Sequence, residues 1–268
     1  PLRLFAAAIF PGLLLAGLYI GYAITRAYLN PAIAPRPPAE EIPPRSQILK
    51  EVLVSFLPLF SLIILVLGTI LGGLATPAEA AGVGAFGAIV LSYFYKTLKW
   101  KNFKESVFLT AKTTAMIMWL FIGSWTFASV FSYLGGHEVF EHFFKSMDLA
   151  PWQFLVITQI IIFLLGWPLE WTEILIIFVP IFLPLVAFFE VNPYFFAMLI
   201  ALNLQTSFLT PPMAMSAYYL KGVQSKNVEL LDIFRGIMPF LGIVIFAMVL
   251  MYLFPGIALW LPDVLFAN

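Results

Sequence analysis

A strip of hydroxyl- and amide-bearing side chains lies inside a long apolar segment and ends at a double proline. The strip comprises Asn203, Gln205, Thr206, Ser207 and Thr210, and Pro211 and Pro212 follow directly. Proline donates no backbone hydrogen bond and disfavours helical geometry at the preceding residue, so this pair predicts a broken helix. We expect unwound backbone from Asn203 to Thr210, whose oxygens would suit a hard cation such as Na⁺. The alternative is that the hydroxyls bond back to their own helix.

A second polar cluster interrupts two shorter apolar runs. It reads Gly166-Trp-Pro-Leu-Glu170-Trp171-Thr172, and Glu173 lies one helical turn after Glu170. A carboxylate near the bilayer interior is costly unless it is paired or ion-bound. Glu170 is therefore a candidate for ion or substrate binding, although both carboxylates are also compatible with a hydrated vestibule and a helix start. Trp167 and Trp171 fit either an interfacial position or a binding surface.

A third cluster, residues 72–81, combines helix-breaking and helix-starting residues. Gly73 and Pro77 break the preceding apolar run, and Thr76 with Glu79 has the spacing of a capping box. A well-capped helix start explains this cluster without any ligand, because a carboxylate in the first turn favours the helix dipole. A functional reading carries equal weight.

The composition indicates an integral membrane protein. Of the 268 residues, 62% are hydrophobic and 10% are charged, against about 25% charged in soluble domains. The zero net charge gives no indication of a nucleic-acid partner, and the lack of cysteine excludes thiolate chemistry. His137 and His142 lie in one polar connection, where we expect solvated side chains. No nucleophile–base–acid set or phosphate loop is present, so we do not expect an enzyme.

The apolar runs and the basic residues together predict a topology. The runs cover residues 4–25, 52–74, 78–95, 113–134, 152–167, 171–189, 194–220 and 237–261. Runs of about 20 residues cross a hydrocarbon core of about 30 Å, whereas 152–167 and 171–189 are shorter, so we predict a re-entrant hairpin over 152–189. With this hairpin, 12 of the 14 basic residues lie on one side of the membrane, and Arg36 and Lys226 are among them. Only Arg3 and Lys145 lie on the other side. The positive-inside rule makes the more basic side cytoplasmic and places both ends of the chain outside.

The predicted fold class is an all-α membrane protein, a multi-span helical bundle with a re-entrant hairpin and a broken helix. We divide it into four regions. These are a transmembrane helix with a proline-rich cytoplasmic loop (1–50, loop 30–47), scaffold-type helices with an interfacial segment (51–136, segment 97–112), a transport-type region with the hairpin 152–189 and the broken helix 194–220 (137–222), and a last transmembrane helix (223–268).

These features together resemble the large membrane subunit of TRAP (tripartite ATP-independent periplasmic) transporters, the DctM-like family. Gly73–Ala81 is similar to the family's Gly-x-x-Thr-Pro-x-Glu-Ala-Ala signature, and Leu209–Pro212 follows a polar stretch as in the family. Pro180–Pro184 and Leu259–Pro262 agree in order and spacing, so the resemblance spans nearly the whole chain. The family usually has aspartate where Glu170 lies.

The resemblance implies half of an inverted-repeat elevator transporter, namely the second repeat with the end of the first, so that an N-terminal repeat is missing from this chain. It implies sodium-coupled import of an organic anion, usually a carboxylate, delivered by a periplasmic substrate-binding protein. Na⁺ is the coupling ion, and no cofactor is expected. A small four-helix, DctQ-like membrane subunit and a bacterial inner-membrane location are implied too.

On this basis we expect the hairpin tip and the polar strip to form one site, with no catalytic residue. The expected Na⁺ ligands are Gly166, Asn203, Thr206 and Ser207. The expected substrate contacts are Trp167, Glu170, Thr172, Gln205, Ser207, Thr210, Pro211 and Pro212. Gly73, Thr76, Pro77 and Glu79 form the expected structural motif. Two alternatives stay open, a divalent anion/sodium symporter that needs no binding protein, and a non-transporting membrane scaffold subunit.

Overall fold

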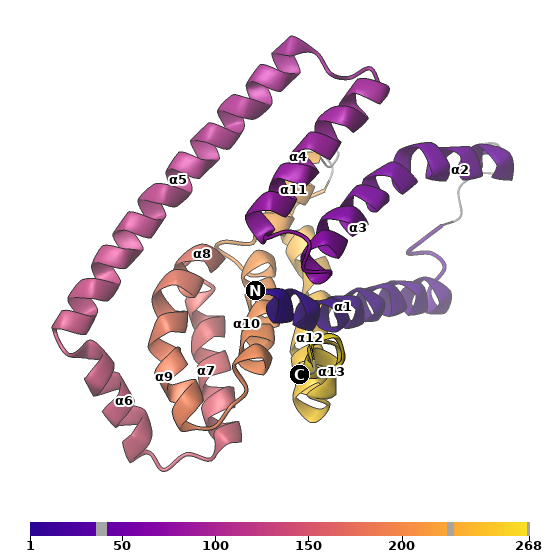
Figure 1. Cartoon of the computed structure of the whole chain (residues 1–268). Helices are drawn as coiled ribbons and strands as arrows, with labels where there is room; N and C mark the ends of the chain where they lie inside the picture. The colour runs from indigo at the N-terminus through magenta and orange to yellow at the C-terminus, as the bar shows by residue number, and fades with distance from the viewer. Residues whose placement is uncertain (36–41, 224–227, 267–268) are drawn as a thin grey trace. The chain divides into compact units, whose positions relative to one another are not determined.

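The computed structural model describes residues 1–35, 42–223 and 228–266, and all regular secondary structure in these ranges is helical (Figure 1). The predicted all-α membrane class is confirmed. Six described helices are long and apolar enough to cross a membrane: Leu2–Leu29, Arg45–Leu71, Pro77–Phe94, Trp100–Tyr133, Trp171–Phe188 and Leu230–Leu253. Some parts of the sequence-based interpretation fall outside the described structure. These are Arg36, Lys226, part of the loop 30–47 and the side chain of His137.

The chain forms two compact units that share two long helices, α1 (Leu2–Leu29) and α5 (Trp100–Tyr133). One unit comprises Pro1–Ala6 and Tyr22–Thr114, and the other comprises Ala7–Gly21 and Ala115–Asn268.

The first unit is built on a close helix pair. α2 (Arg45–Glu51) continues through a π-helical segment, Val52–Phe56, into α3 (Leu57–Leu71), and α4 (Pro77–Phe94) packs against α3. Glycines in α4 permit this approach, because a Cβ at Gly84 would lie 3.1 Å from the Val66 side chain. Gly73 has φ +68°, which closes the turn between the two helices and favours glycine.

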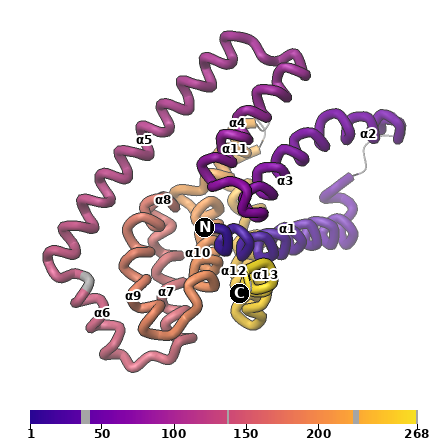
Figure 2. Tube along the Cα trace, in the orientation of Figure 1, coloured from indigo at the N-terminus to yellow at the C-terminus, as the bar shows by residue number. Residues whose placement is uncertain are grey.

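The second unit contains the hairpin and the broken helix. After its parts of α1 and α5 come α6 (Gly136–Ser146) and the first hairpin limb, α7 (Pro151–Leu165). The second hairpin limb consists of α8 (Trp171–Glu173), a π-helical segment (Ile174–Phe178) and α9 (Val179–Phe188). α10 (Pro193–Leu209), α11 (Met215–Val223), α12 (Leu230–Leu253) and α13 (Gly256–Leu265) complete it, as the trace in Figure 2 shows.

Aromatic rings fix the open end of the hairpin against α10. Phe154 in α7 stacks on Phe189 after α9 with centroids 4.6 Å apart, and it also stacks on Phe196 of α10. All three side chains are buried. Because stacked rings contribute beyond the area that they bury, this cluster holds both limbs and α10 together at the end opposite the tip.

Two helices differ from the sequence-based expectation. The segment 97–112 is not a separate interfacial helix, because α5 runs unbroken from Trp100 to Tyr133 and the sequence offers no proline to stop it. The polar connection around His142 is helix α6, which starts after Gly135 at φ +74° and carries a Glu141–Lys145 ion pair one turn apart. Polar composition concealed an amphipathic helix here.

The last apolar run is also divided. Residues 237–261 were expected to form one helix, but α12 ends at Leu253 and α13 begins at Gly256. Pro255 lies between them and supplies no backbone donor for a continuous helix.

Candidate functional site

The double proline breaks the helix where the sequence predicts, but the break is shorter than expected. α10 remains helical to Leu209, Thr210 is extended at φ −104° and ψ 137°, and α11 starts at Met215. Asn203, Gln205, Thr206 and Ser207 therefore lie in helix, and the expectation of unwound backbone from Asn203 onwards is wrong. A proline disturbs the residue before it and leaves the preceding turns able to bond normally.

The break nevertheless frees acceptors on the last turn of α10. Pro211 and Pro212 cannot donate to the carbonyls of Ser207 and Phe208, which are their partners in a regular helix. Ser207 itself belongs to a row of buried polar side chains on α10. The row comprises Asn203, Thr206, Ser207 and Thr210, each at most 5% exposed. Their i, i+3, i+4, i+7 spacing places them on one face of the helix.

Two hydroxyls of this row bond back to their own helix. Thr206 donates to the Asn203 carbonyl at 2.7 Å, and Thr210 donates to the Thr206 carbonyl at 2.9 Å. Each retains oxygen lone pairs, because a hydroxyl donates once and accepts twice. The alternative of local back-bonding therefore holds for these donor protons, while the oxygens stay available as acceptors.

Ser207 instead reaches the hairpin tip. Its hydroxyl donates to the Gly166 carbonyl at 2.8 Å, which joins segments 41 residues apart. A Cβ on Gly166 would lie 3.2 Å from the Ser207 Cβ, so glycine allows this close approach. Of the predicted ion ligands, the structure thus brings Gly166 and Ser207 into direct contact.

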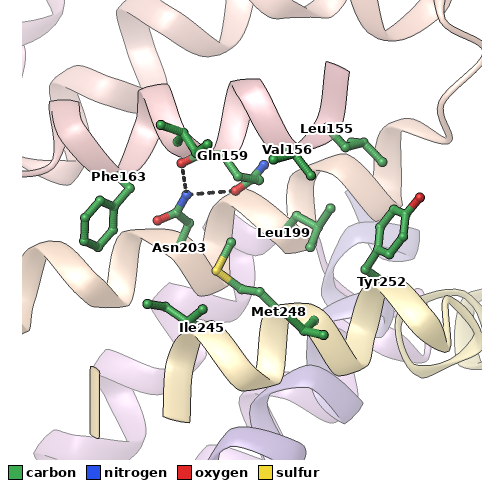
Figure 3. Close-up of a pocket in the computed structure, with 11 residues that line it drawn as sticks. Leu155, Val156, Gln159, Phe163, Leu199, Asn203, Ile245, Met248 and Tyr252 are labelled. Carbon is green, nitrogen blue, oxygen red and sulfur yellow. Dashed lines mark hydrogen bonds between the residues drawn. The ribbon is translucent and has the colours of Figure 1, made fainter. Parts of the chain in front are cut away.

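Asn203 connects α10 to α7 through a buried amide pair. Its Nδ2 donates to the backbone carbonyl of Gln159 at 2.7 Å and to Gln159 Oε1 at 2.9 Å, as Figure 3 shows. Gln159 Nε2 is buried without a hydrogen-bond partner in the described structure. The pair borders an apolar groove of about 290 Å³ between α7, α10 and α12. The sequence analysis missed Gln159, although an amide inside an apolar helix was a usable signal.

The carboxylates at the hairpin tip take different positions. Glu170 precedes α8 in extended geometry, is half-buried, and makes no side-chain capping bond. Glu173 is also half-buried, and its Oε2 atom is buried without a hydrogen-bond partner among the described residues. The reading of Glu170 as a capping residue is therefore not supported by a bond. Glu173, which was not selected from the sequence, is a further candidate for ion or substrate contact.

The other residues that were predicted to contact the substrate are not brought together by contacts between their side chains. Trp167 and Trp171 are 43% and 40% exposed, and Trp167 packs edge-on against Phe163. Thr172 is half-buried. Gln205 and both prolines are exposed, away from the buried row of α10. Their roles stay predictions.

Thr76 and Glu79 form the predicted capping box. Glu79 Oε2 accepts from the Thr76 backbone nitrogen at 2.7 Å and from its hydroxyl at 2.8 Å, and Thr76 Oγ1 accepts from the Glu79 nitrogen at 3.4 Å. Reciprocal bonds of this kind satisfy orphan donors at a helix start. The capping box therefore explains the positions of the Thr76 and Glu79 side chains without any ligand.

Where the hairpin tip meets α10, the structure offers oxygen atoms without formal charge for coordination. Within the described ranges, no group of three or more His, Cys, Asp or Glu side chains is placed to hold a metal ion. The Gly166 carbonyl, the Ser207 hydroxyl and the carbonyls freed by the prolines are hard oxygen donors of the type that alkali and alkaline-earth cations take.

Comparison with known proteins gives a consistent family. A family model described as "Tripartite ATP-independent periplasmic transporter, DctM component" matches residues 2–257. The chain is 27% identical over 264 residues to the C4-dicarboxylate TRAP transporter large permease protein DctM of Rhodobacter capsulatus, covering 98% of this chain and 58% of that protein. It is 25% identical to the Pseudomonas aeruginosa protein of the same name, covering 97% and 60%.

A relative with a different printed substrate is equally similar. The sialic acid TRAP transporter large permease protein SiaM of Vibrio cholerae is 29% identical over 265 residues, covering 97% of this chain and 59% of that protein. The chain thus spans about three fifths of the length of these relatives. The relatives are named as transporter permeases, in agreement with the lack of an enzyme motif in the sequence.

Proposed function

Because the chain belongs to the DctM-component family of tripartite ATP-independent periplasmic transporters, we propose that it forms part of the membrane subunit of a sodium-coupled importer of organic anions. The observation that carries the proposal is the hydrogen bond from Ser207 to the Gly166 carbonyl. It joins the tip of a helical hairpin to a helix that breaks three residues later, at Thr210.

Coupling follows from where the cation binds. Na⁺ held by the Gly166 carbonyl and the oxygens of Ser207, with Asn203 and Thr206 from the same face of α10, stabilises the closed contact between tip and helix. An ion shifts a conformational equilibrium only by its difference in affinity for the two states. If the closed tip also forms the substrate site, ion and substrate increase each other's affinity equally. The hairpin and α10 then move together as the mobile part of an elevator.

The substrate is a carboxylate in this proposal. The printed substrates of the DctM and SiaM relatives, C4-dicarboxylates and sialic acid, carry carboxylate groups, whereas the isethionate of a further relative is a sulfonate, which is also an organic anion. The helix starts after Glu170 and after the double proline offer partly positive ends to such an anion. Trp167, Thr172, Gln205 and Thr210 are the side chains that we assign to its remaining contacts.

The proposal includes the partners that a tripartite system requires. These are a periplasmic substrate-binding protein, a small DctQ-like membrane subunit, and the part of the large subunit that corresponds to the remaining length of the relatives. We place the assembly in the bacterial inner membrane, with both ends of this chain on the periplasmic side.

Uptake by the assembled transporter in proteoliposomes tests the proposal. Radiolabelled C4-dicarboxylates and sialic acid are supplied with the binding protein, with an inward sodium gradient or with equal sodium on both sides. We expect accumulation of substrate above its external concentration only with the gradient. Accumulation to the same level with equal sodium on both sides contradicts the coupling.

The two alternatives give different results in the same assay. Uptake without the binding protein indicates a symporter that works alone. A scaffold role predicts that replacing Thr206, Ser207 and Thr210 with alanine leaves sodium-driven uptake intact.

A further inference from the structure

A second groove lies in the first unit, between α4 and the first half of α5, and no step of the proposed transport uses it. Its volume is about 650 Å³, within the range of about 300–1,000 Å³ that is typical of small-molecule sites. Its wall on α4 is apolar and comprises Ala85, Ala88 and Ile89, whereas its wall on α5 alternates apolar residues with Ser106 and Thr110. α4 is apolar and long enough to span a membrane over its whole length, so its wall of the groove lies at lipid depth.

Polar side chains from both helices and from their connection meet at one end of the groove. Ser92, Thr97 and Asn102 line this end. Asn102 Nδ2 donates to the Thr97 carbonyl at 3.1 Å, and Thr97 Oγ1 donates to the Ser92 carbonyl at 3.2 Å. These bonds hold the segment between α4 and α5 in place at the end of the groove. The polar end is therefore an ordered structure in which side chains bond to the backbone.

The polar end is also basic. Lys96 and Lys99 flank Thr97 and Leu98 in the sequence, and Thr97 and Leu98 both line the groove. Both lysine side chains are exposed. Among the described residues that line the groove, none is acidic. Lys101, Glu105 and Lys112 fall on the other face of α5 by helical periodicity, because the lining residues of α5 recur on one face from Asn102 to Ala111.

We propose that this groove binds one anionic phospholipid, with its phosphate at Lys96 and Lys99 and an acyl chain along Ala85, Ala88 and Ile89 of α4. A groove with an apolar wall on a membrane-spanning helix and a polar, basic rim matches a molecule with an anionic head and an apolar tail. Lysines attract anionic headgroups at the membrane surface, and the long lysine stems let the ammonium groups reach them. The alternative occupant is an apolar transmembrane helix of a partner protein. Such a helix would cover the apolar wall of the groove but would bring no negative charge to the two lysines.

Lipid titration of the assembled transporter tests this proposal. The purified, delipidated complex is titrated with phosphatidylglycerol or phosphatidylcholine, and bound lipid is counted by native mass spectrometry. The test variant carries Lys96→Asn and Lys99→Gln; asparagine tolerates the positive φ of 57° at Lys96. The matched control carries Lys101→Gln and Lys112→Gln, which removes the same charge from the other face of α5.

We expect one tightly retained phosphatidylglycerol per large subunit. Its affinity falls about 30-fold in the test variant, at roughly fivefold for each lysine, and stays unchanged in the control. Equal loss in both variants indicates diffuse charge attraction and overturns the proposal. Equal retention of phosphatidylcholine, or no retained lipid because protein fills the groove, also overturns it. A third contradiction is equally tight binding of glycerophosphoglycerol, the headgroup without acyl chains.

Discussion

Ser207 is the side chain on which the proposed coupling depends. It is 4% exposed, and its hydroxyl is the link between α10 and the Gly166 carbonyl. Replacement by alanine removes this bond and one candidate cation ligand while leaving the helix intact. We expect the sodium concentration for half-maximal uptake to rise about fivefold, because a hydrogen bond contributes about 1 kcal/mol. The measurement is uptake as a function of sodium in proteoliposomes.

Thr158→Val is the matched control for Ser207→Ala. Thr158 is also fully buried, but its hydroxyl donates to carbonyls of its own helix, those of Phe154 and Leu155 at 2.9 Å. Its removal leaves the contact between hairpin tip and α10 in place, so the sodium dependence should stay as in the wild type. An unchanged sodium dependence in Ser207→Ala refutes the assignment of this side chain to the coupling site.

The residue types of the polar strip were predictable, but their grouping was only partly so. Asn203, Thr206, Ser207 and Thr210 share a buried face of α10, whereas Gln205 is exposed. Treating the strip as unwound concealed this difference, since only a helix sorts residues by their spacing. The partner atoms on the hairpin, the Gly166 carbonyl and the Gln159 amide, depend on tertiary packing over about 40 residues and are not specified by local pattern.

At the scale of elements, α7 and α10 are connected by the Asn203–Gln159 amide pair. Asn203→Leu leaves Oε1 of Gln159 without its donor, whereas the Gln159 carbonyl keeps its bond within α7, and we expect a cost of about 1–3 kcal/mol. Combining it with Gln159→Leu removes the orphaned side-chain acceptor, so the double variant should lose less than the sum of the single variants. We expect a coupling of about 1 kcal/mol, typical of hydrogen bonds between membrane helices. Unfolding in denaturing detergent measures each free energy.

Gln205→Leu is the control for this cycle. It makes the same amide-to-apolar change on the same helix at an exposed position, so little change in the free energy of unfolding is expected. If the losses of Asn203→Leu and Gln159→Leu add without coupling, the pair does not hold the two helices together.

The position of the helix break was predictable, and its length was not. Proline lacks the donor that a helix needs, which places the break at Pro211 and Pro212 from sequence alone. How far the break extends depends on a free-energy difference. It is set by whether the residues before the prolines are more stable in a packed helix or in an unwound, solvated conformation. The buried face of α10 packs against α7 and α12, and this packing keeps Asn203 to Leu209 helical despite their polar side chains.

At the scale of the whole molecule, composition decides the class and little else. A hydrophobic fraction of 62% leaves no soluble alternative, whereas helix α6 is amphipathic and polar enough to escape a search for apolar runs. The hairpin limbs show the same limit. α7 has 15 residues, about 22 Å, which is short for a span, but the second limb from Trp171 to Phe188 is long and apolar enough to cross. Length alone does not decide between re-entrance and crossing.

Labelling of single cysteines decides between these topologies. The chain has no cysteine, so Ser146→Cys and Glu190→Cys each introduce its only thiol, one before and one after the hairpin. The start of α7 and the end of α9 border one shallow hollow, so a re-entrant hairpin predicts that an impermeant maleimide labels both positions from the periplasmic side of intact cells. Lys101→Cys and Val223→Cys should react only after the membrane is opened. If Glu190→Cys behaves like this second pair, the hairpin crosses the membrane and the proposed meeting of its tip with the break at midplane depth is wrong.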